Sequence, residues 1–161
     1  MEYQRYKKVL FCTDFSENSD YAFEFALGIA KIGGGLLYIL HVIPANPHLA
    51  LCGKYITRED SEKIQIGIVE EDLDIKYREH YVKRMENGIK FEIVTKIGRE
   101  DEEIIKFAER EKVDLLVLGT HSRTGLEHVF YGSVAENVIR RSPFPVFVIP
   151  SRRMLERSEG V

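Results

Sequence analysis

Apolar and polar positions along this chain follow two different periodicities. Five runs are continuously apolar or change polarity at every residue, as buried and half-buried strands do. They are Val9 to Cys12, Leu36 to Val42, Ile89 to Ile97, Leu115 to Leu118 and Val146 to Ile149. Continuous apolar runs are typical of a parallel sheet covered on both faces. The alternation in Ile89 to Ile97 places that strand nearer an edge of the sheet.

Between these runs, apolar residues recur at steps of three or four, which predicts amphipathic helices. The predicted helices begin after the N-cap residues Ser16 to Asn18, at Arg58, at Arg99 and at Gly132-Ser133. The first three of them end at Gly33-Gly34-Gly35, at Asn87-Gly88 and at Lys112. The stripe of the long second helix runs from Ile66 through Tyr77 and Tyr81 to Met85.

Strands that alternate with helices require a parallel sheet with right-handed crossovers, hence a three-layer, doubly wound α/β fold. In such folds, ligands bind beyond the carboxyl ends of the strands, where the strand order reverses. Asp14 and Gly119 both follow predicted strands. If the first and fourth strands are neighbours, both residues border one crevice.

Composition narrows the class of protein. With 161 residues, of which 44% are apolar, the chain is long enough for one core, which we expect within residues 1–150. The tail, residues 151–161, is polar and is expected to be loose. A net charge of −3 does not indicate the basic surface that binds nucleic acid. No apolar run reaches the roughly 20 residues that span a membrane. The start lacks a signal-peptide core, and Cys12 and Cys52 form no C-x-x-C, so we expect a soluble cytoplasmic protein.

The segment from Val113 to Pro150 carries the main chemical signal. A strand ends at Gly119, a polar loop follows, and Gly132-Ser133 opens a helix with Val134 in its first turn. The first N–H groups of a helix are unpaired and carry a partial positive charge, so they attract phosphate. Arg123 in the loop adds a guanidinium suited to bidentate phosphate contact. The pattern indicates binding of a phosphorylated small molecule.

This segment resembles the nucleotide loop of the universal stress protein family, G-x2-G-x9-G-[ST]. Gly119, Gly132 and Ser133 match, and Ser122 stands in place of the second glycine. The first strand and its end are similar to the family's V-P-x-D-x-S. There Asp14 and Ser16 match, and Cys12 replaces the proline. The similarity extends from about Tyr6 to Pro150.

The resemblance implies a Rossmann-like fold of the adenine-nucleotide α-hydrolase type, with five parallel strands. It also implies ATP as ligand, or AMP or ADP, with Mg²⁺ or Mn²⁺ bridging the phosphates. The candidate nucleotide-binding residues are Thr13, Asp14, Val42, Gly119, Ser122, Arg123, Gly132, Ser133 and Val134. The Cβ of Ser122 could hold a phosphate off the backbone, whereas its hydroxyl could donate to a phosphate oxygen.

Each candidate also has a purely structural explanation. Gly119 can be an ordinary turn glycine, and Asp14 can hold a turn or cap the first helix. Ser133 can cap the last helix, with Glu136 completing a capping box. Arg123 can be a solvated loop charge.

Two functions remain open on these residues. One is an ATP-binding stress-response regulator with little or no hydrolysis, recognised by an unidentified protein partner. The other is an interaction module that binds no nucleotide and acts as a homodimer through the strand Val146 to Ile149, which the family often pairs. No P-loop, G-x-G-x-x-G or Ser-His-Asp arrangement is present. A hydrolase or transferase that uses Asp14 would need a partnered base, and the sequence shows none.

Overall fold

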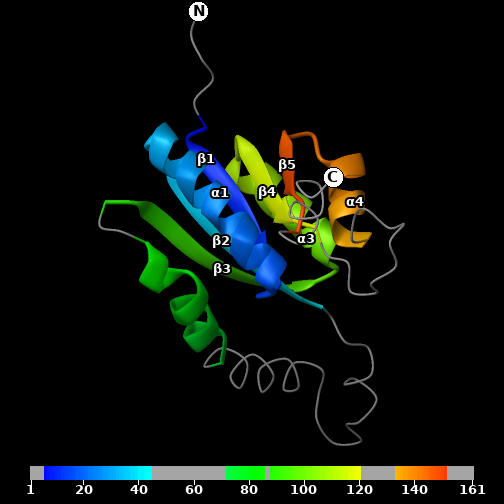
Figure 1. Cartoon of the computed structure of the whole chain (residues 1–161). Coiled ribbons are helices and arrows are strands. Elements are labelled where there is room, and N and C mark those ends of the chain that lie inside the picture. The colour runs from blue at the N-terminus through cyan, green and yellow to red at the C-terminus, as the bar shows by residue number, and fades with distance from the viewer. Residues whose placement is uncertain (1–5, 45–71, 86–87, 121–132, 152–161) are drawn as a thin grey trace, which may run out of the picture.

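Five parallel strands form one sheet with helices on both faces in the computed structural model of the chain (Figure 1). The structure describes residues 6–44, 72–85, 88–120 and 133–151. The strands lie in the order β3-β2-β1-β4-β5. Their bounds are β1 Lys8–Thr13, β2 Leu36–Pro44, β3 Lys90–Gly98, β4 Leu115–Gly119 and β5 Val146–Ile149. The doubly wound, Rossmann-like fold predicted from the sequence is confirmed. The first and fourth strands are neighbours, which meets the condition for one crevice that borders both Asp14 and Gly119.

Two hydrophobic layers hold the helices against the sheet. On one face, α1 (Glu17–Gly33) and a helical segment at residues 72–80 pack on the strands, with fully buried Phe11 and Phe23 at the centre. On the other face lie α3 (Glu100–Glu111) and α4 (Ser133–Arg141). The inward side of α3 is formed by buried Ile104, Phe107 and Ala108.

Both ends of α1 are closed by residues that the sequence singles out. The Ser16 hydroxyl accepts from the backbone N–H of Ser19 at 3.3 Å, which satisfies one of the unpaired donors of the first turn. Gly34 follows the helix with φ of 61° and donates its N–H back to the last carbonyls. A left-handed conformation costs glycine little, which explains the stop.

The prediction that the second helix continues to Asn87 is wrong. Helical geometry ends at residue 80, and a short 3₁₀ turn, η2 (Val82–Arg84), follows. Tyr81 has φ of −126° and is fully buried, with its ring against Phe11 and Phe23. Tertiary packing of this ring therefore overrides the continuing helical pattern. The part of that helix expected before residue 72 lies outside the described residues.

The last turn of α4 is held by an ion pair to another helix. Arg141 donates to the buried carboxylate of Asp101 at 2.8 Å, and Arg99 holds the other oxygen at 2.8 Å. This triad ties α4 to the start of α3. Among the helices of the described residues, none combines the length and apolar character that crossing a membrane requires.

Candidate functional site

The carboxyl ends of β1 and β4 meet where the strand order reverses. Strands run outward from β1 to β2 and β3 on one side, and from β4 to β5 on the other. Cys12 of β1 pairs with Leu118 of β4, so Thr13 and Gly119 are the next residues along the two strands. This edge is the place where open α/β sheets bind ligands.

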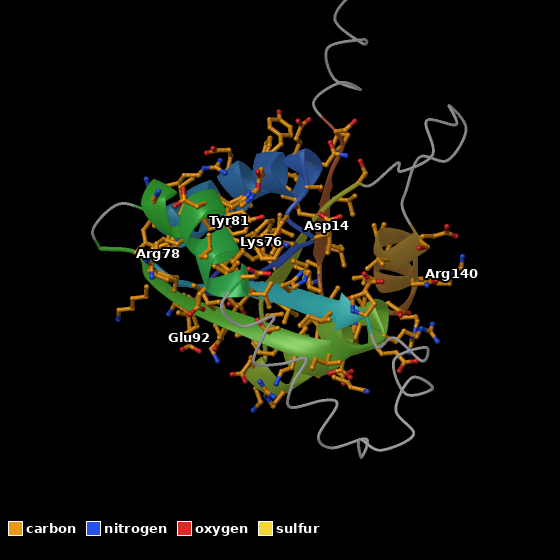
Figure 2. All side chains as sticks on the ribbon, turned by 90° about the horizontal axis from the view of Figure 1, so that it is seen from below. Asp14, Lys76, Arg78, Tyr81, Glu92 and Arg140 are labelled. Atoms are coloured by element: carbon orange, nitrogen blue, oxygen red, sulfur yellow. The ribbon has the colours of Figure 1, made fainter. Side chains whose placement is uncertain are left out.

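The structure brings four of the predicted residues to this edge. Thr13 pairs with His41 of β2, so Asp14 and Val42 are the next residues along these two strands. Thr13 and Val42 are buried, whereas Asp14 is exposed. Figure 2 shows Asp14 at the end of β1, beyond the sheet.

Thr13 has a structural role that its sequence position does not reveal. Its hydroxyl donates to the Ser19 hydroxyl at 3.2 Å and forms a short contact with the Tyr81 hydroxyl. A hydroxyl has one proton, so Tyr81 donates in that contact. The network joins the end of β1 to α1 and to the segment that carries Tyr81. Burial raises the pKa of Tyr81 well above its usual range, so the donor stays protonated.

Asp14 holds the turn between β1 and α1. Its Oδ1 accepts from the backbone N–H of Ser16 at 3.1 Å, while the carboxylate remains exposed to solvent. The turn explanation offered by the sequence is therefore observed. It is compatible with a ligand, because a carboxylate has several acceptor positions.

Phe15, between these residues, has a positive φ of 59°, which is uncommon for a bulky side chain. Its ring contacts the rings of His41 at 4.8 Å and Tyr77 at 5.1 Å between centroids. The Lys76 ammonium lies 5.7 Å from the same centroid. Backbone strain of this kind persists where surrounding packing determines it, and it clusters at functional sites. Sequence reasoning missed Phe15, because no local pattern signals a left-handed aromatic residue.

His41 is fixed in one tautomer. Its Nδ1 lies 2.8 Å from the carbonyl oxygen of Thr13, and a carbonyl only accepts, so Nδ1 carries the proton and the neutral ring keeps Nε2 as acceptor. Burial lowers the pKa of His41, more than the bond to Thr13 raises it. This bond links the side chain of His41 in β2 to the end of β1.

Gly119 is the last residue of β4 and lies against α1. A Cβ built there would come within 2.8 Å of the Asn18 carbonyl oxygen, which is closer than side chains tolerate. The glycine therefore permits close packing of β4 on α1. This packing role of Gly119 differs from both roles that the sequence suggested, which were an ordinary turn and the close approach of a ligand.

Thr120, the next residue, is buried and bonds the backbone at and just after the end of β5. Its N–H donates to Ile149 at 2.9 Å, and its hydroxyl accepts from Ser151 at 3.2 Å. Its position directly after Gly119 is the signal that could have drawn attention to it. These two hydrogen bonds fix Thr120 against the end of β5, directly after β4 ends.

The phosphate side of the candidate site is described only where α4 begins. Ser133 is exposed, and Val134 is half-buried against the core. The Glu136 carboxylate accepts from Arg140 at 2.7 Å, one turn along the helix. Ser122, Arg123 and Gly132 lie outside the described residues, so their predicted contacts remain predictions.

The described part of the chain contains no group of three or more His, Cys, Asp or Glu side chains placed to hold a metal ion. Cys12, in β1, is buried, and this burial raises the pKa of its thiol far above the usual range. It behaves as a small apolar core residue.

Comparison with known proteins agrees with the fold. The model of a family described as universal stress proteins matches residues 5–150. A universal stress protein from Methanocaldococcus jannaschii, MJ0577, is 32% identical, with 89% of this chain and 94% of the relative covered. The solved structure of MJ0577 superposes with a TM-score of 0.72 at 30% identity, over 92% of this chain and 99% of the other.

Two further solved structures contain nucleotides. A universal stress protein in complex with cAMP matches with a TM-score of 0.59 at 22% identity, over 92% of this chain and 99% of the other. One from Archaeoglobus fulgidus in complex with dAMP matches with a TM-score of 0.59 at 21% identity, over 91% and 99%. At these identities the likeness demonstrates a shared fold.

Proposed function

This chain belongs to the universal stress protein family, and from that premise we propose that it binds an adenine nucleotide at the carboxyl edge of β1 and β4. ATP is the proposed ligand, with AMP and ADP as alternatives. The observation that carries the proposal is the row that Val42, Thr13, Asp14 and Gly119 form along the carboxyl edge of the neighbouring strands β2, β1 and β4, at the reversal of strand order. Relatives of the same fold bind cAMP and dAMP, which share the adenine ring.

Each residue has a chemical part in this proposal. The exposed carboxylate of Asp14 accepts from ribose hydroxyls while its Oδ1 keeps the Ser16 turn. The backbone at Thr13 and Val42 lines the adenine pocket. Ser133, Val134 and Gly132 supply N–H groups and a hydroxyl to the phosphates at the start of α4. Ser122, Arg123 and Gly119 complete the loop side of the cradle.

A Mg²⁺ or Mn²⁺ ion bound with the nucleotide would neutralise and bridge the phosphates. The proposed donors from the protein are hydroxyls, backbone N–H groups and a guanidinium, which suit phosphate oxygens. We propose binding with little or no hydrolysis, since the proposed residues include no partnered general base. Nucleotide occupancy would then bias a conformation that a protein partner recognises.

A second candidate function, a homodimeric interaction module, is favoured by the exposed edge at β5. Phe147 of β5 is 41% exposed, although its ring contacts Phe25 of α1. Pairing of β5 across a two-fold axis would cover this side chain. The dimer is compatible with either function.

Thermal unfolding in the presence of different nucleotides tests the proposal. We expect ATP with Mg²⁺ to raise the unfolding temperature and GTP to leave it unchanged, because only adenine fits a pocket that backbone groups line at Thr13 and Val42. Stabilisation equal for both nucleotides would indicate nonspecific phosphate binding. An unfolding temperature that neither nucleotide changes would favour the second candidate function, the homodimeric interaction module.

A further inference from the structure

The outer strand β3 has an edge with no strand partner among the described residues. Of the strands that the structure describes, β3 pairs with β2 alone, and it lies at the opposite side of the sheet from β5. Three of its apolar side chains are between 37% and 45% exposed: Phe91, Ile93 and Ile97. An exposed apolar edge strand offers both its backbone groups and its side chains to another strand.

The two faces of β3 differ in chemistry. Its register with β2 places Phe91, Ile93 and Ile97 beside Leu37, Ile39 and Ile43, on the α1 side of the sheet. Glu92, Val94 and Lys96 lie beside Tyr38, Leu40 and Val42, on the α3 side. Figure 2 shows Glu92 on the opposite side of β3 from Tyr81 and Lys76. One face of the edge is therefore apolar except at Thr95. The other face carries Glu92 and Lys96 on either side of Val94, with Lys90 at the start of the strand.

The sequence of β3 complements itself in the antiparallel direction. If two copies of β3 pair about a two-fold axis at Val94, Glu92 of each copy lies opposite Lys96 of the other. On the other face, Phe91 lies opposite Ile97 of the second copy, again twice. Opposite charges and aromatic–aliphatic pairs at facing positions each stabilise an antiparallel pair.

Neighbouring registers lack this match. Directly opposite residues must share a face, so the register slips in steps of two residues. Moving the axis to Ile93 sets Lys90 against Lys96, two like charges. Moving it to Thr95 sets Glu92 against Gly98 and leaves both lysines unmatched. Charge thus selects the register centred on Val94.

We propose that β3 is a second homotypic interface, in which two copies of the chain pair their β3 edges antiparallel about Val94. The self-complementary charges favour a second copy over an unrelated strand. Pairing would continue the sheet from one molecule into the next and cover the exposed Phe91 and Ile97. Because β3 and β5 are opposite edges, this contact and a β5 contact can coexist.

Charge reversal tests the pairing. Glu92→Lys or Lys96→Glu alone places like charges at both facing sites, and the double variant restores opposite charges. By sedimentation velocity, we expect wild type and the double variant to form assemblies at least twice the mass of either single variant at the same concentration. Equal masses for all four proteins, or no recovery in the double variant, would overturn the proposal.

Cross-linking tests the register independently. In a Cys52→Ser background, Val94→Cys brings two thiols together at the axis, whereas Lys90→Cys faces Gly98 of the second copy. We expect mild oxidation of dilute protein to produce a disulfide-linked dimer rapidly for Val94→Cys and slowly for Lys90→Cys. Equal rates would contradict the register. Circular dichroism of each variant confirms that differences do not arise from unfolding.

Discussion

Gly119 at the end of β4 lies so close to Asn18 in the first turn of α1 that no side chain fits between them. A Cβ on Gly119 would be 2.8 Å from the Asn18 carbonyl oxygen and 3.2 Å from the Ser19 nitrogen. Both neighbours are backbone atoms, which cannot swing away. The packing of α1 on β4 therefore requires glycine, whatever ligand the edge binds.

Gly119→Ala should destabilise the protein by about 1–3 kcal/mol, the range typical of overpacking against a rigid neighbour. Urea unfolding measures the change. Gly28→Ala is the matched control, because a Cβ built at this α1 position meets nothing within 4 Å. It should stabilise by about 0.5–1 kcal/mol through helix propensity. Equal effects at the two positions would contradict the packing explanation.

Contacts such as this one separate the features that sequence patterns predict from those that depend on residues distant in the chain. Continuous apolar runs and N-cap residues predicted the five strands and α1, because these features are local, and the alternation of strands with helices predicted the parallel sheet through connection rules. The role of Gly119 could not be predicted, since its neighbour Asn18 is distant in sequence. The same holds for the bond between Thr13 and Tyr81, which coincides with the early end of the second helix.

The candidate site was predictable only in part. Motif spacing located Asp14, Val42 and Gly119 at strand ends, and the fold brings them to one edge. Phe15 and Thr120 were missed because their significance depends on backbone conformation and on a bond to Ser151, respectively. The ion pair between Arg141 and Asp101 could not be predicted, because the two residues lie in different helices.

Asp101 should make stability depend on acid pH. Burial alone would raise its pKa, but hydrogen bonds and charge from Arg99 and Arg141 outweigh burial and lower it. The native pKa is therefore below the unfolded value of about 3.9, so the stabilisation is complete above about pH 4 and is lost as pH falls through the native pKa. Asp101→Asn should cost about 1–3 kcal/mol at pH 7 and less near pH 3.

Urea midpoints at the two pH values check this dependence. Glu136→Gln is the control, because its ion pair with Arg140 is exposed and contributes at most about 0.5 kcal/mol. A penalty for Asp101→Asn that does not change with pH would show that the carboxylate contributes through shape and not through charge.

His41 should titrate at lower pH than an exposed histidine. Burial lowers its pKa, so the native ring is neutral where the unfolded ring, with a pKa of about 6.5, begins to gain a proton. Its contribution to stability is therefore present above about pH 6.5 and declines as pH falls toward the native pKa. Ring nitrogen shifts in NMR should report a proton on Nδ1. A titration midpoint at or above the ordinary value would contradict this arrangement.

Asp14→Asn separates the ligand role of this residue from its turn role. The amide oxygen can still accept from Ser16, so the turn and the unfolding free energy should be preserved. Loss of a charge-assisted bond to ribose should weaken nucleotide binding by about tenfold or more. Asp14→Ala removes both roles and should also lower stability. Unchanged affinity in Asp14→Asn would exclude the carboxylate from the site.

Nucleotide binding itself is measured by calorimetric titration of the purified, ligand-free protein with ATP and Mg²⁺ or Mn²⁺, with Gly132→Asp measured beside it. A carboxylate at the predicted phosphate seat should repel the ligand. We expect a dissociation constant on the order of micromolar for the wild type and no measurable binding for the variant. No heat and no thermal shift for the wild type at millimolar ATP would contradict the proposed nucleotide binding.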